Sequence, residues 1–491
     1  MTPQQFNDYA QQDFNRIPIS REILADLHTP LSAYLKLANG AYSYLLESVH
    51  GGEQWGRYSI IGLPCQTVVK IFDHDITVTV GDNIVESITH PKPLEWIEEF
   101  TMRYRVPDID GLPRFNGGLV GYFGYETIAY IEPRVLKKTK PDEIGAPDIL
   151  LMVSEELLIF DNLSGKMLIL IHANPQDENA YQKAIDRLHA ITLTLQTPHP
   201  QSAPYEVQSK QIKETDFISG FTQTGFEKAV CKAKEYITDG DIMQVVLSQR
   251  LSIPYRAEPL NLYRALRCLN PSPYMFYLNV DDFHIVGSSP EILVRLEDNT
   301  ITVRPIAGTR RRGSTPEQDL ALEKELLNDP KEIAEHLMLI DLGRNDAGRV
   351  SEIGSVQLTD KMIVERYSHV MHIVSNVTGS LQRNKNAFDV LAATFPAGTV
   401  SGAPKIRAME IIDELEPVKR GIYSGAVGYI GWRGNLDTAI AIRTAIIKEG
   451  QLHIQAGAGI VYDSIPKNEW DETMNKARAI FQAVAIAEAG L

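Results

Sequence analysis

Strand-like segments follow one another in runs along the first part of this chain, and this feature constrains its fold most. Residues 67–87 read as a meander, and residues 148–173 read as strands joined through the turn Asn162–Gly165. In an α/β fold the strands would instead alternate strictly with helices. We therefore expect an α+β architecture with much antiparallel sheet.

The length of 491 residues favours two domains, or one very large composite one. The segment 196–216 is polar, contains proline and lacks periodicity, so it is the best linker candidate. It follows a helix-like stretch over 178–196. We expect an N-terminal domain over 1–205 and a second domain over 217–491.

Composition and charge disfavour several classes of partner. The formal net charge of −15 argues against nucleic acid, because binding a phosphate backbone depends on lysine and arginine. We find no signal peptide and no run of about 18 apolar residues, so we expect neither export nor a membrane span. The three separated cysteines, Cys65, Cys231 and Cys268, are typical of reduced thiols in a cytoplasmic protein.

Capping chemistry predicts three helix starts. Each places a hydroxyl or carboxyl side chain three residues before Glu or Gln, and two of them have proline at the first helical position. The pairs are Thr224 with Glu227, Thr315 with Gln318, and Asp329 with Glu332. A buried strand is expected after the first of these helices, over 242–255.

The helix predicted after Asp329 carries two carboxylates on one face. Glu332, Glu335 and His336 share that face because they lie three or four residues apart. A capping residue beside a solvated charge explains the pattern. A Mg²⁺ site also explains it, since Mg²⁺ prefers one or two carboxylates with water and substrate oxygens. Position along the helix does not decide between these interpretations.

A second acidic group lies near the C-terminus. If a helix begins around Trp470, Glu472 and Lys476 form an i,i+4 pair, which alone is an ordinary surface feature. The preceding residues 457–459 are predicted to form a turn after a strand, where backbone N–H groups can approach an anion.

Three further features can contact a ligand. Small and hydroxylic residues at 398–402 precede Pro404 and a predicted helix, whose N-terminus can receive an oxygen anion. His369 and His372 lie on a predicted strand but three residues apart, so they point to opposite faces. Arg443 is expected inside an apolar strand, where its charge requires a carboxylate from the protein or from a ligand.

The stretch 303–313 leaves two interpretations open. Small or hydroxylic residues at 307–309 precede three arginines, so the segment either binds something small or merely turns. Arg311 and Arg312 read as solvated or interface charges.

Seven motifs occur in a fixed order along the second half: PIAGT, EHLMLIDLGRND, SHVMHIVS, TFPAGTVSGAPK, YSGAVGYIG, GAGIV and DET-NKA. Together they resemble the chorismate-utilising enzymes, and most closely the branch that forms anthranilate. The resemblance covers 224–484 nearly end to end and the first half weakly. It implies a large antiparallel β-sandwich flanked by helices, with the ligand held between the sheets.

The resemblance also implies the site residues. Glu335 and Glu472 match the metal ligands, so Mg²⁺ is the expected cofactor. The positions that match substrate contacts are Gly308, Thr309, Tyr423, Arg443, Gly457, Ala458, Gly459 and Lys476. His372 and Thr399 match residues that orient the substrate and assist elimination.

The implied reaction adds ammonia at C2 of chorismate while the C4 hydroxyl leaves, after which pyruvate is eliminated. Protonating the hydroxyl needs an acid, and Glu332 is our candidate. Gln244 stands where water-adding relatives carry a lysine base, which disfavours water addition. Ala307 stands where the aminodeoxychorismate-forming branch carries a nucleophilic lysine, and alanine cannot attack. That branch and a catalytically silent tryptophan-sensing subunit stay open as alternatives.

The first half resembles the tryptophan-binding segment of the family. Glu47 and Ser48 match it, and Pro273, Tyr274 and Met275 match its partner across the domain boundary. A buried strand and an aromatic packing strip would explain these residues from pattern alone. With the resemblance, they predict a regulatory N-terminal domain and feedback inhibition by L-tryptophan. No cysteine lies in an amidotransferase-like loop, so ammonia is expected free or from a separate glutamine amidotransferase subunit.

Overall fold

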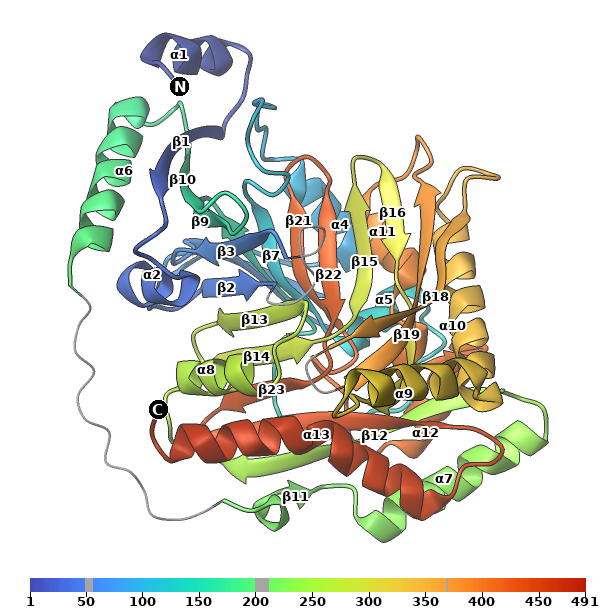
Figure 1. The fold of residues 1–491 in the computed structure, drawn as a ribbon. Coiled ribbons are helices and arrows are strands. Elements are labelled where there is room, and N and C mark those ends of the chain that lie inside the picture. The colour runs from blue at the N-terminus through green and yellow to red at the C-terminus, as the bar shows by residue number, and fades with distance from the viewer. Residues whose placement is uncertain (49–55, 199–211, 368–369) are drawn as a thin grey trace.

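The computed structural model describes residues 1–48, 56–198, 212–367 and 370–491. Two twelve-stranded sheets, in which every pair of neighbouring strands is antiparallel, form its centre. Helices pack on their outer faces (Figure 1). The structure therefore confirms the expected α+β sandwich.

The first sheet combines strands from both halves of the chain. Its strands are β1 Ile17–Leu24, β2 Ser43–Glu47, β3 Tyr58–Gly62, β9 Glu156–Asp161, β10 Lys166–Ala173, β11 Ile218–Ser219, β12 Gln244–Pro254, β13 Tyr274–Asn279, β14 Phe283–Ser289, β20 Gly402–Ala403, β23 Thr444–Lys448 and β24 Gln451–Ile460. Their spatial order is β1–β10–β9–β3–β2–β13–β14–β23–β24–β12–β11, and β20 pairs with β12.

The second sheet is also built from both halves. Its strands are β4 Thr67–Phe72, β5 Asp75–Val80, β6 Asn83–Thr89, β7 Gly118–Phe123, β8 Ile149–Ser154, β15 Ile292–Glu297, β16 Thr300–Val303, β17 Ile306–Arg311, β18 Gln357–Arg366, β19 Val370–Ser380, β21 Ala426–Gly431 and β22 Leu436–Ile440. Their order is β17–β19–β16–β15–β22–β21–β7–β8–β4–β5–β6, and β18 pairs with β19.

The helices cover the outer faces of the two sheets. The α-helices are α1 Pro3–Gln11, α2 Pro30–Leu37, α4 Pro93–Thr101, α5 Ile128–Ile131, α6 Ala180–Gln196, α7 Gln223–Thr238, α8 Pro259–Leu269, α9 Pro316–Asn328, α10 Pro330–Gly348, α11 Ala387–Thr394, α12 Lys405–Leu415 and α13 Pro466–Glu488, and the short 3₁₀ helices are η1 Tyr125–Thr127, η2 Glu214–Asp216 and η3 Gly398–Val400. Buried residues of α2, α6, α8 and α13 pack on the first sheet, and those of α4 and α11 pack on the second. Among the described residues, no helix is both long enough and apolar enough to cross a membrane.

The main core between the sheets is aromatic and aliphatic. Tyr44 and Phe276 of the first sheet pack there with Tyr122 and Leu150 of the second, and all four side chains are almost completely buried. Burying such side chains contributes about 1.5–3 kcal/mol each, which is the main force that holds the sheets together.

Strands of the first half are built directly into both sheets beside strands of the second. β2 pairs with β13, and β7 pairs with β21. The expected linker lies partly within 199–211, outside the described residues. The division into a regulatory segment over 1–205 and a catalytic segment over 217–491 stays a prediction.

Most elements expected from local patterns are present. The meander over 67–87 is β4 to β6, the strands over 148–173 are β8 to β10, the helix over 178–196 is α6, and the strand over 242–255 is β12. Their hydrophobic periodicity and turn residues are local features, which explains why they could be read directly.

Two predicted helix starts are wrong. The cap of α7 is Thr222, whose hydroxyl accepts a hydrogen bond from the Gly225 N–H at 3.2 Å, so the expected Thr224 box does not form. The last helix, α13, begins at Pro466 and not near Trp470. The caps at Thr315 and Asp329 are confirmed, although neither forms the reciprocal box expected with Gln318 or Glu332.

Candidate active site

The stretch 303–313 contains a strand, β17, with a bulge at Gly308. The pairing of β17 with β19 shifts register between Ala307 and Thr309, and Gly308 has a φ of +69°. A Cβ at residue 308 would lie 3.2 Å from Glu332 Oε2, so the first turn of α10 packs closely on the bulge. Glycine is therefore required here both for its backbone conformation and for its small size.

His372 of β19 lies against this bulge. Its Nδ1 is 3.0 Å from the Gly308 carbonyl oxygen and 3.0 Å from Thr309 Oγ1. Donation to the carbonyl places the proton on Nδ1 and leaves Nε2 as an acceptor. Burial lowers the pKa of His372, and the nearby charge of Arg443 acts in the same direction. The imidazole is therefore neutral at pH 7. His369 lies outside the described residues.

Two carboxylates from helices far apart in the sequence lie near enough to influence each other electrostatically. Glu335 is on α10, and Glu472 is on α13. Burial raises the pKa of Glu335, and the charges of Glu332 and Glu472 raise it further. A divalent cation between these carboxylates would offset that cost.

The donor set fits Mg²⁺. No group of three or more His, Cys, Asp or Glu side chains in the described part of the chain is arranged to enclose a metal. A pair of carboxylates is what Mg²⁺ takes when water and substrate oxygens complete its shell. Glu335 and Glu472 are the residues that would hold it.

Lys476 connects this carboxylate pair with β24. Its Nζ lies 2.7 Å from Glu472 Oε1 and donates to the Gly457 carbonyl at 2.9 Å. The i,i+4 pair with Glu472 was expected from spacing. Its bond to the strand connects the pair to β24, which an isolated pair on a helix surface would not do.

Residues 457–459 do not form the predicted turn. They lie within β24 and pair with β12, whereas the pairing of β24 with β23 reaches only Ile454. The edge of 455–460 that faces away from β12 is therefore free of β23, and alternate backbone N–H groups along such an edge can meet an anion. At Gly457 the missing side chain admits Tyr423, whose hydroxyl would lie 2.7 Å from an added Cβ.

Arg443 lies at the bend between β22 and β23, and not inside a strand as predicted. Its φ is +50°, and no carboxylate of the described residues is within ion-pair distance. Burial lowers its pKa, while the charge of Glu472 opposes that effect. A guanidinium in this state lacks its natural partner, which a substrate carboxylate would supply.

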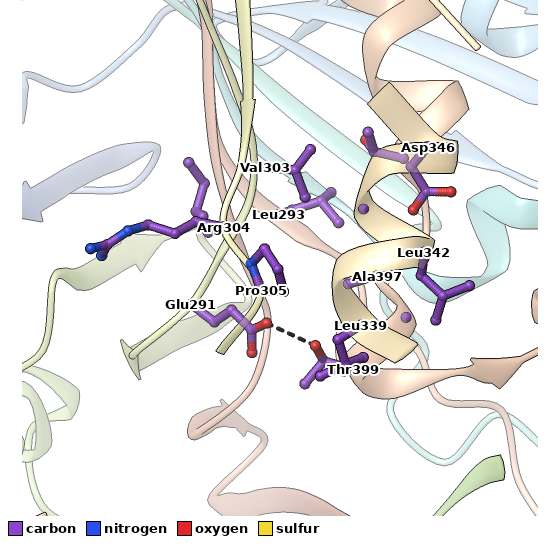
Figure 2. Close-up of a pocket in the computed structure, with 14 residues that line it drawn as sticks. Glu291, Leu293, Val303, Arg304, Pro305, Leu339, Leu342, Asp346, Ala397 and Thr399 are labelled. Carbon is purple, nitrogen blue, oxygen red and sulfur yellow. Dashed lines mark hydrogen bonds between the residues drawn. The ribbon is translucent and has the colours of Figure 1, made fainter. Parts of the chain in front are cut away.

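Glu291 belongs to the site although it was not predicted. The residue is 4% exposed, and Thr399 Oγ1 donates to its Oε1 at 2.7 Å (Figure 2). Burial raises the pKa of Glu291 to about 8. It lines a cavity of about 30 Å³ together with Pro305 and Leu339, which is room for a water molecule. The only signal for Glu291 in the sequence is that an acidic residue precedes the apolar run of β15.

Glu332 has a different environment from Glu291. Arg310 Nη1 donates to its Oε1 at 3.0 Å. Arg312, expected to be a solvated or interface charge, instead forms an ion pair with Asp319 at 2.8 Å. Arg311 is exposed, as expected.

Comparison with known proteins shows the family of the chain. Residues 45–482 match the family model described as chorismate binding enzyme. The chain is 59% identical to anthranilate synthase component 1 of Pseudomonas aeruginosa, with 99% of each protein covered. It is 56% identical to the protein of that name from Neisseria meningitidis serogroup B, with 100% of this chain and 99% of the relative covered. The chain belongs to the anthranilate synthase component I family.

Solved structures agree with this family. Anthranilate synthase component I from Streptococcus pneumoniae TIGR4 matches with a TM-score of 0.78 at 37% identity, over 94% of this chain and 99% of that one. MenF, the menaquinone-specific isochorismate synthase of Escherichia coli, matches with a TM-score of 0.70 at 19% identity over 98% of both chains. The second likeness concerns the fold alone.

In this member of the anthranilate synthase component I family, both discriminating positions lie at the site. The Gln244 side chain lowers the pKa of Glu335, against the effect of burial, and lies over the backbone of Gly459. Its Oε1 has no hydrogen-bond partner among the described residues. Ala307 adjoins the Gly308 bulge on β17. Both positions that were predicted to disfavour water addition and lysine attack therefore lie beside predicted site residues; their roles stay predictions.

The two segments predicted to bind tryptophan are adjacent. Glu47 of β2 pairs directly with Met275 of β13, and Ser48 follows β2. Pro273 immediately precedes β13, and the Tyr274 hydroxyl donates to Asp437 at 2.8 Å. Tryptophan binding by these residues stays a prediction.

Glu47 already has strong partners in this arrangement. It is 5% exposed, and its carboxylate accepts hydrogen bonds from the Tyr263 hydroxyl and, at 3.0 Å, from Arg267 Nε. The carboxylate is thus held in place at the junction of the two halves.

Proposed function

We propose that this chain converts chorismate and ammonia to anthranilate, pyruvate and water. The observation that carries the proposal is that the Glu335 and Glu472 carboxylates lie near two cations, Lys476 and Arg443, and that no carboxylate of the described residues forms an ion pair with Arg443. A dianionic substrate and a divalent cation together would complete the charge balance of such a site.

The chain's own residues divide the task of binding. Arg443 and Lys476 attract the substrate carboxylates, and the unpaired edge of β24 supplies backbone donors. Tyr423 and the bulge at Gly308 and Thr309 bound the rest of the site. Mg²⁺, when held by Glu335 and Glu472, neutralises a substrate carboxylate.

Departure of the C4 hydroxyl as water needs a proton donor. Glu291 has its pKa raised to about 8 by burial, so it carries a proton at pH 7, and Thr399 fixes the direction of its carboxyl group. The Glu332 carboxylate instead bonds to Arg310. We therefore propose Glu291 as the acid, with Glu332, our candidate from the sequence, as the alternative to be tested beside it.

We assign His372 as the base, because its hydrogen bond to the bulge fixes which ring nitrogen carries the proton. Because its Nδ1 proton is directed at the Gly308 carbonyl, its Nε2 can accept a proton as pyruvate is eliminated and the ring becomes aromatic. Thr399 orients the carboxyl group of Glu291, and Thr309 orients the imidazole of His372.

The remaining expectations concern partners and regulation. We propose that a glutamine amidotransferase subunit supplies ammonia and that L-tryptophan inhibits the reaction through Glu47, Ser48, Pro273, Tyr274 and Met275. The adjacency of β2 and β13 supports one effector contacting both segments. The protein is expected in the cytoplasm, where chorismate chemistry and reduced cysteines are compatible.

The test is incubation of the purified chain with chorismate, Mg²⁺ and ammonium at mildly alkaline pH, without and with tryptophan. Fluorescent anthranilate and an equal amount of pyruvate are expected, and tryptophan should suppress both. Consumption of chorismate without fluorescence or pyruvate would identify the aminodeoxychorismate-forming alternative. Tryptophan binding without any consumption would identify a silent sensing subunit.

A further inference from the structure

The Arg310 side chain forms ion pairs with three carboxylates beside the bulge. Its Nε donates to Glu325 at 2.9 Å, its Nη2 donates to Asp329 at 2.6 Å, and its Nη1 donates to Glu332 at 3.0 Å. The same Nη1 also donates to the Thr309 carbonyl at 3.0 Å. One side chain therefore joins the bulge strand to two helices.

The partners of Arg310 are concentrated where α9 ends and α10 begins. Glu325 lies in the last turn of α9, and Asp329 is the cap that accepts from the Lys331 and Glu332 N–H groups. Glu332 is in the first turn of α10, and Glu335 follows it on the same helix. A displacement of this first turn would carry Glu335 with it, because a helix moves as a rigid element.

The apolar packing at this corner is a small cluster separate from the large cores. Its buried residues are Leu326, Met371 and Ile373, with the partly buried Leu322, Met362 and Val364 packed against them. The ion pairs of Arg310 add directional contacts to this packing between α10 and β17. The fork of the arginine side chain can bind several carboxylates at fixed angles, which lysine cannot do.

We propose that Arg310 is a positioning residue, which holds the Gly308–Thr309 bulge at a fixed distance from α10 and thereby fixes the substrate contacts relative to Glu335. Glu332, on α10, contacts both Arg310 and the bulge directly. One of its oxygens accepts from Arg310, and the other lies over Gly308, 3.2 Å from where a Cβ would be. The inference rests on the proposed roles of Glu335 and of the bulge.

The chain offers a matched control in Arg312. It follows β17 and also forms a two-pronged ion pair, with Asp319 at 2.8 and 3.1 Å, on the neighbouring helix α9. Its other bond is to the Tyr367 carbonyl, and no bond joins it to α10. Loss of Arg312 should thus remove a two-pronged arginine–carboxylate ion pair beside the bulge without releasing the helix that carries Glu335.

The experiment compares Arg310→Gln, Arg310→Lys and Arg312→Gln in the full chain. Arg310→Gln should lower kcat/KM for chorismate by about a hundredfold, the scale expected for a displacement of about 1 Å. Calorimetric titration with Mn²⁺ in the absence of substrate should show about tenfold weaker binding, as for loss of an outer-shell support. Arg310→Lys should recover part of the loss in kcat/KM and part of the loss in Mn²⁺ affinity. Arg312→Gln should change neither quantity by more than about twofold when variants of equal melting temperature are compared.

Equal losses in Arg310→Gln and Arg312→Gln would overturn the proposal, as would wild-type values in Arg310→Lys. If Arg310→Gln does not fold, the comparison of Arg310→Lys with Arg312→Gln decides in the same way. Because Mn²⁺ binding is measured without substrate, the inference can be tested even if wild-type protein makes no anthranilate. In that case the proposed function would fail by itself.

Discussion

At the scale of single residues, the pair Glu291 and Thr399 shows what a sequence pattern leaves out. The residue types of Ser-Pro-Glu before an apolar run are ordinary at the start of a strand. Only the fold brings a hydroxyl to 2.7 Å from this carboxyl group and buries the residue away from bulk solvent. Its raised pKa is therefore a consequence of long-range packing.

Replacement of Glu291 by glutamine should remove the acidic proton and keep the size and shape of the side chain. We expect kcat to fall by about 10²–10⁴, the usual contribution of a general acid, with little change in KM for chorismate. Steady-state kinetics of Glu291→Gln and Glu332→Gln side by side would assign the acid. A larger fall in kcat for Glu332→Gln would restore the assignment made from the sequence.

The pH dependence of the wild-type protein should reflect the same group. Since the pKa of Glu291 is raised from 4.5 to about 8, the folded protein keeps a proton that the unfolded chain releases. The contribution of this group to stability is therefore full below pH 4.5 and is lost as the pH rises toward 8. Activity should also decline above pH 8 at constant free ammonia. Urea unfolding from pH 5 to 9 should show a flatter profile for Glu291→Gln.

Gly308 should tolerate no side chain. In Gly308→Ala the left-handed φ of +69° costs about 1–2 kcal/mol, and the new Cβ meets Leu326, Glu332 and Ile373 at 3.1–3.2 Å. The control is Gly111→Ala, where φ is +85° but nothing lies within 4 Å. Denaturation should show a greater loss of stability at 308 than at 111. Equal losses would mean that the close approach of α10 is unimportant.

At the scale of secondary-structure elements, local chemistry predicted α9 and α10 well. Thr315 and Asp329 cap them through bonds to residues two or three positions ahead, so the information is contained in a few consecutive residues. The strand containing residues 457–459 was misread as a turn, because its glycines serve close approaches from elsewhere in the fold, of Tyr423 at Gly457 and of Gln244 at Gly459. Arg443 was placed inside a strand because its neighbours in the sequence are apolar, whereas the chain bends there between β22 and β23.

The correction at the start of α7 can be tested directly. Thr222→Ala should destabilise the protein by about 1 kcal/mol, since it removes the hydroxyl that accepts from the Gly225 N–H. Thr224→Ala should be nearly neutral because Thr224 is not the cap. Thermal unfolding of the two variants distinguishes them. The opposite order would support the cap expected from the sequence.

At the scale of the whole molecule, both sheets are continuous across the two halves of the chain. Pairing of β2 with β13 and of β7 with β21 joins residues more than 200 positions apart. Such pairings leave no local pattern, which is why the order of strands could come only from resemblance to a known fold. The ordered motifs did predict the fold class correctly, and the electrostatic influence of Glu472 on Glu335 is consistent with the metal pair that they imply.

A fragment of residues 217–491 should not fold alone. Its strands β13 and β21 would lose their partners β2 and β7, and the buried face between the sheets would be exposed. We expect aggregation on gel filtration, and recovery of a folded complex when 1–205 is expressed with it. A monomeric fragment with a cooperative melting transition would contradict this expectation.

Tryptophan inhibition should depend on the junction between the halves. We expect Ser48→Ala and Met275→Thr each to abolish inhibition while basal anthranilate formation continues, because neither residue lies among the proposed catalytic groups. The measurement is the dependence of initial rate on tryptophan concentration. Unchanged inhibition in both variants would remove this site from the proposal.

The position of α13 has a consequence for synthesis of the protein. Glu472 and Lys476 lie on the helix Pro466–Glu488, and they interact with Glu335 and Gly457 of elements that precede it in the sequence. A nascent chain therefore lacks half of the proposed metal-binding pair and one of the proposed substrate cations until α13 has been synthesised. Every molecule truncated before this helix, by a premature stop codon or by proteolysis, should be unable to consume chorismate.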